Sequence, residues 1–358
     1  MAIYDIIIGI MAIFAVLGAA DRIFGNRFGL GKHFEEGILA MGSLALAMIG
    51  IISLAPVLAK VLKPVIIPLY GALGADPAMF AGTILANDMG AGPLAAEMAL
   101  SAEAAGLGGV ITGSMLGATI VFTIPVALGI LQPEDRGNLA KGILCGIITI
   151  PVGVLVGGLT AGYPADMVLR NLVPIVLFAL FIALGLWKAE NAMIKGFTLF
   201  GTIITALITL GLLAAIVETL TGVTLIPGLA PLSEGFETVG EIAIVLCGAF
   251  PLVFTVTRLL QKPLLAAGRK LGINETAAAG LVASLANSIA TFGMVKDMDQ
   301  RGKVVNIAFA VSAAFVFGDH LGFTAGFAPQ LLVPMILGKL VGGISAIGVA
   351  LLLTRKKA

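Results

Sequence analysis

Charged residues are scarce in this chain. Asp, Glu, Lys and Arg together make up 11% of its 358 residues, whereas hydrophobic residues make up 59%. Soluble domains carry about 25% charged residues, and a mean hydropathy of +1.10 excludes that class. The net charge of +1 and the lack of a basic tract exclude a nucleic-acid-binding surface. The composition predicts an all-α polytopic membrane protein in a lipid bilayer.

Cysteine and histidine are almost absent. Cys145 and Cys247 stand alone within apolar runs, and the two histidines have no metal-ligand spacing around them. This excludes a disulfide framework, a CxxC redox motif and a zinc site. No serine or cysteine stands in a recognisable nucleophile elbow. We therefore expect no metal, no cofactor and no enzymatic activity.

Long apolar runs, in contrast, are abundant. A spanning helix needs about 20 apolar residues, and the first run, which has no basic leader, is predicted to be a retained membrane helix. Two further segments, 77–100 and 276–298, are too interrupted to span as simple helices. The predicted spanning helices are 3–20, 37–61, 105–131, 139–162, 171–188, 196–220, 238–261, 302–326 and 331–353.

The segment FAGTILANDMGAGPLAAE (80–97) reads as a membrane helix that breaks halfway, at Asn87, Asp88 and Gly90. A carboxylate at membrane depth is costly unless it faces a bundle interior, a water-filled cavity or a cation. Broken helices with polar tips form substrate sites in many secondary transporters. The alternative is a Gly/Pro kink whose Asp88 side chain points into the headgroup region.

The two halves of the chain repeat each other. Lys63-Pro64 matches Lys262-Pro263, Leu85-Ala86-Asn87 matches Leu285-Ala286-Asn287, and Ser114 matches Ser312, all near an offset of 198. A constant offset indicates an internal repeat. It divides the chain into a first helix and loop (1–36), repeat one (37–162), connecting helices (163–237), repeat two (238–353) and a cytoplasmic tail (354–358).

Lys and Arg decide whether the repeats are parallel or inverted, because they are enriched in cytoplasmic loops. Lys339 lies within a predicted span and is left out. If both interrupted segments return to the side they came from, 17 basic residues lie inside and three outside; if both cross, the split is 10 to 10. We therefore predict inverted repeats with two re-entrant hairpins, about nine spanning helices, the N-terminus outside and the C-terminus inside the cell membrane.

Paired hairpin tips would meet near the membrane midplane and supply a binding site. Asp319 and His320, adjacent in an apolar run, suggest cation binding or a proton relay; an ion pair near the outer end of a helix is the alternative. Glu97 is interpreted either as a vestibule carboxylate or as a solvated loop charge. The candidate substrate-binding residues are Asn87, Asp88, Glu97, Asn287, Ser288, Thr291, Asp319 and His320. Their carboxylates favour a cationic solute or coupling cation.

Several long motifs resemble the EutH family of ethanolamine permeases. They include LAPVLAKVLKPVIIPLYGALGADPAMFAGTILANDMG (54–90), MDQRGKVVNIAFAVSAAFVFGDHLGF (298–323) and GKLVGGISAIGVA (338–350). The resemblance covers nearly the whole chain. It implies a carrier in the bacterial inner membrane that supplies ethanolamine to a catabolic pathway.

Ethanolamine suits the predicted site. Asp88 is expected to be the main partner of its ammonium, Asp319 and His320 a second partner or proton relay, and an Asn or Ser the partner of its hydroxyl. Phe122, Phe292 or Phe317 could add about 1–2 kcal/mol by cation–π contact. The alternatives are a sodium- or proton-coupled carrier of another small amine or amino acid, and a membrane-embedded enzyme. The sequence leaves open a homo-oligomer.

Overall fold

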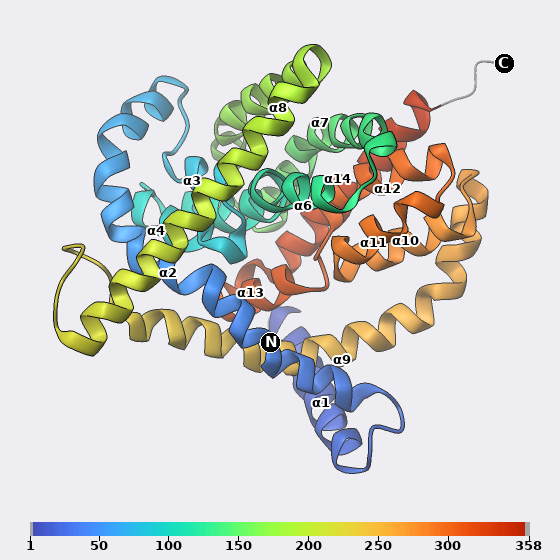
Figure 1. The fold of residues 1–358 in the computed structure, drawn as a ribbon, viewed down its shortest axis with the longest axis horizontal. Helices are drawn as coiled ribbons and strands as arrows, with labels where there is room; N and C mark the ends of the chain where they lie inside the picture. Colours follow the sequence, from blue (N-terminus) through green and yellow to red (C-terminus); the bar gives the residue numbers. More distant parts are fainter. Residues whose placement is uncertain (1–2, 355–358) are drawn as a thin grey trace.

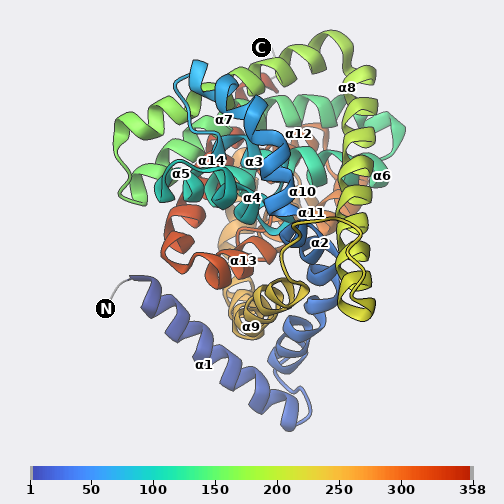
Figure 2. The same ribbon diagram turned by 90° about the vertical axis from the view of Figure 1, so that its left-hand side faces the viewer.

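The computed structural model describes the backbone of residues 3–354, and within this range all side chains except those at positions 3, 4, 190, 194, 260–262, 264, 265, 267 and 269. The predicted tail beyond Thr354 lies outside the described residues. Within residues 3–354 the secondary structure consists of helices joined by loops, without any strand, which confirms the all-α class. Helix α9 runs along one side of the molecule and contacts α1 and α2, while α8 forms an outer wall (Figures 1 and 2).

The first half begins with two long helices and continues with short, interrupted ones. A π-helical stretch, with wider turns than an α-helix, occupies much of the run 102–130. The elements are α1 (Ile3–Ile23), α2 (Leu30–Ala72), α3 (Ala78–Ile84), η1 (Asn87–Met89), α4 (Ala91–Met98), α5 (Ala102–Ala105), η2 (Gly106–Gly117), η3 (Thr119–Thr123), α6 (Ile124–Ile130), η4 (Pro133–Asp135) and α7 (Arg136–Thr160).

The second half starts with α8, whose helical path is interrupted at Ala189 (φ −146°, ψ 48°). The elements are α8 (Ala165–Thr221), α9 (Leu232–Leu271), α10 (Glu275–Ala286), α11 (Ser288–Met294), η5 (Val295–Asp297), α12 (Gln300–Ala313), α13 (Asp319–Phe327), η6 (Pro329–Leu331) and α14 (Leu332–Leu353).

Eight helices in the described part of the chain are long and apolar enough to cross a membrane. The predicted span 302–326 is wrong as a continuous helix, because α12 ends at Ala313 and α13 starts at Asp319. Helix α2 extends beyond the predicted 37–61 and contains three prolines. Membrane helices tolerate proline when neighbouring groups satisfy the freed backbone.

Glycines allow the broken segment to lie close against η2, because small residues let two backbones approach closely. Added Cβ atoms at Gly109, Gly113 and Gly117 would lie 2.8, 3.0 and 1.8 Å from atoms of the segment 85–95. Gly117 directly faces the carbonyl oxygen of Leu85. The backbone of α3 and α4 is therefore seated in a groove of small residues.

Two short helix pairs turn back on themselves. In hairpin one (78–98), the Asp76 carboxylate accepts from Ala78 N at 2.9 Å and from Leu100 N at 3.0 Å, which joins its two ends. In hairpin two (275–294), Asn274 accepts from Ala277 N at 2.9 Å and donates to the Asp297 carbonyl at 3.0 Å. In both pairs, one capping side chain at the start binds the backbone near the end.

Candidate functional site

The tip of hairpin one positions Asp88. Helix α3 gives way to extended backbone at Leu85 (φ −122°, ψ 145°), and η1 makes a single turn. Helix α4 follows Gly90, whose φ of +97° lies in the left-handed region. A Cβ at Gly90 would lie 2.1 Å from the Ile51 side chain, so conformation and space both require glycine. This turn fixes Asp88 between two short helices.

Hairpin two positions Asp319. The chain between α12 and α13 is not helical, and Phe315 has a φ of +62°. Its backbone N–H donates to Ser284 O at 3.0 Å, and the N–H of Phe317 donates to Leu285 O at 2.9 Å. Both acceptors lie at the end of α10. The tip of hairpin two therefore binds the non-helical segment 314–318 and sets the start of α13 at Asp319.

A chain of polar contacts runs from α14 to the tip of hairpin one. The Lys339 ammonium donates to the carbonyl of Ser114 and lies 3.0 Å from Nδ1 of His320. On the other side of the ring, Nε2 of His320 lies 3.6 Å from Oδ1 of Asp88. Lys339 and His320 are buried, while the Asp88 side chain keeps 17% exposure. Asp88 therefore faces His320 on one side and open space on the other.

That open space is a cavity of about 190 Å³. Asp88, Asp319 and His320 line it together with Ser43 and apolar side chains. Two aromatic rings, Phe122 and Phe315, form part of its wall and meet edge to face at 5.4 Å between centroids. The cavity thus combines two carboxylates with aromatic surface, in a volume suited to a small molecule.

A larger cavity, about 760 Å³, meets the first at Asp319, which lines both. It reaches outward past Phe317 and Asn287 to His33, Glu36 and Arg258, and its walls are mostly apolar. His33 and Glu36 contact each other at 2.6 Å. This second cavity forms a vestibule between the carboxylates and the end of the molecule where α2 begins.

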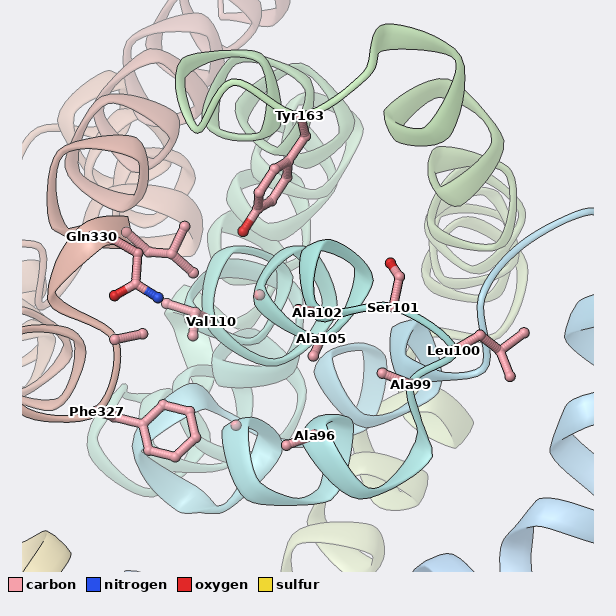
Figure 3. Close-up of a pocket in the computed structure, with 14 residues that line it drawn as sticks. Ala96, Ala99, Leu100, Ser101, Ala102, Ala105, Val110, Tyr163, Phe327 and Gln330 are labelled. Carbon is pink, nitrogen blue, oxygen red and sulfur yellow. The ribbon is translucent and has the colours of Figure 1, made fainter.

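A third cavity, about 470 Å³, lies at the opposite end of the molecule. Figure 3 shows the Tyr163 hydroxyl and the Gln330 amide pointing into it, with the Phe327 ring at its edge. Burial, together with the nearby Glu103 charge, raises the pKa of Tyr163 to about 12, so this hydroxyl stays protonated. The cavity has no charged lining residue.

The structure brings some of the predicted site residues together and separates others. Asp88, Asp319 and His320 share the small cavity, and Asn287 lines the vestibule while it caps α11 through the Ile289 N–H. Glu97 is exposed and lines none of these three cavities. It therefore lies apart from the other carboxylates.

The remaining predicted residues are buried within the two hairpins. Thr291 donates to Gly280 O at 2.9 Å and contacts the Ser284 hydroxyl, which braces hairpin two internally. The amide of Asn87 and the hydroxyl of Ser288 are buried without a hydrogen-bond partner among the described residues. Of the proposed aromatic residues, Phe122 lines the small cavity and Phe317 the vestibule, whereas Phe292 lies elsewhere.

Lys339 was missed as a site residue. It was recognised as a lysine within a predicted span, and the high cost of burying such a charge was the available signal. Its partners, Ser114 and His320, are 225 and 19 residues away along the chain, so sequence alone could not pair them. Within residues 3–354, no group of three or more His, Cys, Asp or Glu side chains could hold a metal ion.

Comparisons with known proteins give a consistent result. The family model described as "Ethanolamine utilisation protein, EutH" matches residues 3–353. The chain is 60% identical to the "Probable ethanolamine permease EutH" of Listeria monocytogenes over 99% of this chain and 95% of that protein. It is 50% identical to the protein of the same name in Escherichia coli K12, over 100% and 97% of the two chains. The "Uncharacterized protein YxeR" of Bacillus subtilis is 51% identical over 99% of this chain and 96% of its own length. No solved structure matches the chain.

Proposed function

Because the chain belongs to the EutH family of ethanolamine utilisation proteins, we propose that it imports ethanolamine across the bacterial cytoplasmic membrane. Family membership supports a membrane permease, and two relatives carry the printed name of a probable ethanolamine permease. The observation that carries the proposal is the cavity between hairpin one and α13, where two carboxylates face the same small space.

The charge of the cavity fits the chemistry of ethanolamine. A primary alkyl amine with a lysine-like pKa near ~10.4 is protonated at neutral pH. Its ammonium would bind Asp88, with Asp319 as a second partner. Phe122 and Phe315 present aromatic surface beside the carboxylates, which adds cation–π attraction. The hydroxyl of the substrate would reach Ser43 or a backbone group at the tip of hairpin one.

The proposed transport mechanism depends on two inverted repeats, and the order of elements supports the repeat. In each half a long helix (α2, α9) precedes a hairpin, a run of short helical pieces, a 3₁₀ turn after proline (η4, η6) and a final helix (α7, α14). The caps follow the same offset of 198: Asp76 and Asn274 begin the hairpins, and Ser101 and Asp299 cap α5 and α12. These pairs extend the offset seen in the sequence.

The cavities support alternating access in an inward-facing state. The vestibule connects Asp319 with the end of the molecule that holds the loop 24–29, the predicted cytoplasmic end. Toward the other end, Phe323 and Phe327 stack at 5.0 Å between centroids and leave no space for a Cβ at Gly92. This stack borders the cavity of Figure 3, where Phe327 forms part of the edge. It would act as a closed outer gate.

Cysteine accessibility tests the inverted, re-entrant arrangement. In a chain whose two native cysteines are replaced by alanine, single cysteines are placed at four exposed positions that flank the hairpins: Ala72, Leu100, Lys270 and Lys296. A membrane-impermeant maleimide is expected to label the first pair in intact cells and the second pair only after permeabilisation. Labelling of Ala72→Cys and Leu100→Cys from opposite sides would show that the first hairpin crosses the membrane.

Uptake tests the substrate. Liposomes containing the purified protein should take up labelled ethanolamine saturably, and protein-free liposomes should not. Uptake at the protein-free level, with another small amine transported, would overturn ethanolamine as the substrate while leaving the fold unchanged.

A further inference from the structure

Lys339 places a positive charge inside the site. Its side chain is 1% exposed, and its ammonium is held by the Ser114 carbonyl and by Nδ1 of His320. Among the described residues, no carboxylate oxygen lies within 4.0 Å of this nitrogen. Contacts connect Lys339 to a carboxylate through the His320 ring, whose other nitrogen lies 3.6 Å from Asp88.

With Lys339 as an ammonium, its contact determines the tautomer of His320. A lysine ammonium donates hydrogen bonds and cannot accept them, so Nδ1 of His320 is the acceptor in this contact. The ring proton is then on Nε2, which faces the Asp88 carboxylate at 3.6 Å. His320 is therefore a neutral bridge that orients two charged groups, and it adds no charge of its own.

The charges that face the small cavity can then be counted. Asp88 and Asp319 line it with a formal charge of −1 each, and Lys339 supplies +1 behind His320. The sum is −1, so one singly charged cation neutralises the site. A dication would leave one positive charge uncompensated beside Lys339, which is costly in a low-dielectric interior.

We propose that Lys339 is a specificity-determining residue that limits the site to organic cations carrying a single ammonium group and rejects diamines. The inference rests on the proposed transport of ethanolamine and adds to it the charge class of the substrates. Its mechanism is repulsion of the unwanted ligand, because the second ammonium of a diamine would add a positive charge near Lys339 with no carboxylate left to neutralise it.

Matched ligands test the inference in the wild-type protein. 3-Amino-1-propanol and 1,3-diaminopropane have similar length and differ in one terminal group, a hydroxyl or a second ammonium. Each compound is added as a competitor of labelled ethanolamine, and uptake into proteoliposomes is measured at neutral pH. The amino alcohol is expected to inhibit about 100-fold better, a ratio that corresponds to ~2.8 kcal/mol. Equal inhibition would overturn the inference without any variant.

Variants assign the effect to Lys339. Lys339→Met makes the sum −2 and is expected to narrow the preference for the amino alcohol by about tenfold or more. The double variant Lys339→Met/Asp319→Asn returns the sum to −1 and is expected to restore it. For variants that bind without transporting, thermal stabilisation by each ligand in detergent measures the preference for the amino alcohol over the diamine. An unchanged preference in a Lys339→Met protein that elutes and melts as a folded chain would contradict the proposal.

If the wild type neither binds nor transports ethanolamine, the proposed function fails first, and this inference fails with it.

Discussion

Asp88→Asn is expected to reduce ethanolamine uptake by about 30-fold or more at low substrate concentration. Truncating one partner of a desolvated, hydrogen-bonded charge pair costs about 2–5 kcal/mol, and ~1.4 kcal/mol corresponds to a factor of ten. The substitution keeps the shape of the side chain and removes its charge. It also brings the formal charge that faces the cavity from −1 to zero, so the site no longer favours an ammonium ion over a neutral amine. Initial rates in proteoliposomes, normalised to the amount of inserted protein, measure the effect.

Glu97→Gln is the matched control for Asp88→Asn. Both residues are carboxylates of the segment 80–97, but Glu97 is exposed and lies away from the cavity. Its substitution is expected to leave the uptake rate within about twofold of wild type, because isolated surface charges contribute little. Wild-type uptake by correctly inserted Asp88→Asn would contradict the assignment of Asp88. Loss of uptake in Glu97→Gln would show that this carboxylate contributes to transport and is not merely a solvated loop charge.

Asp135→Asn is expected to destabilise the fold by about 3–5 kcal/mol, because it leaves the Lys303 ammonium buried without its partner. The two side chains form an ion pair at 2.6 Å and are 5% and 11% exposed. Asp135 ends η4 in the first half of the chain, and Lys303 lies on α12 in the second. Asn138 donates to Gln300 at 2.9 Å nearby, so this polar group joins the two halves at one end of the molecule.

Unfolding in detergent measures the loss of stability in Asp135→Asn, with the exposed pair Arg22–Glu35 as the control. That pair is at 3.3 Å with side chains 55% and 47% exposed, and Glu35→Gln is expected to change stability by less than about 1 kcal/mol. The double variant Asp135→Asn/Lys303→Met should be more stable than Asp135→Asn alone, since it removes the unpaired charge. Equal stability of Asp135→Asn and Glu35→Gln would show that Lys303 does not depend on Asp135.

Local sequence was enough to find the first interruption. Between Leu85 and Gly90, a polar pair and a glycine in the left-handed region follow an apolar run, and each of these features disfavours a continuous helix. The positions of Asp88, Asp319 and His320 around one cavity also follow from placing polar residues away from lipid. The predicted repeat rests on short matched segments, such as Leu85-Ala86-Asn87 and Leu285-Ala286-Asn287, at an offset near 198.

Tertiary contacts determine what the sequence did not reveal. The segment 314–318 is apolar and contains no proline, so it was predicted as part of a helix spanning 302–326. Its backbone instead hydrogen-bonds to Ser284 and Leu285, which only hairpin two brings into reach. Lys339 likewise finds its partners on η2 and α13. Local propensity contains no information about either set of contacts.

We propose that this permease carries ethanolamine as an ammonium ion bound between two carboxylates. The most direct test is initial uptake of labelled ethanolamine by wild-type proteoliposomes, at constant total concentration, while the pH rises through the pKa of the amine. We expect saturable uptake that declines with the protonated fraction of the amine and is inhibited by other small monocations. Uptake that increases as the neutral base accumulates, or that equals uptake by protein-free liposomes, would contradict it.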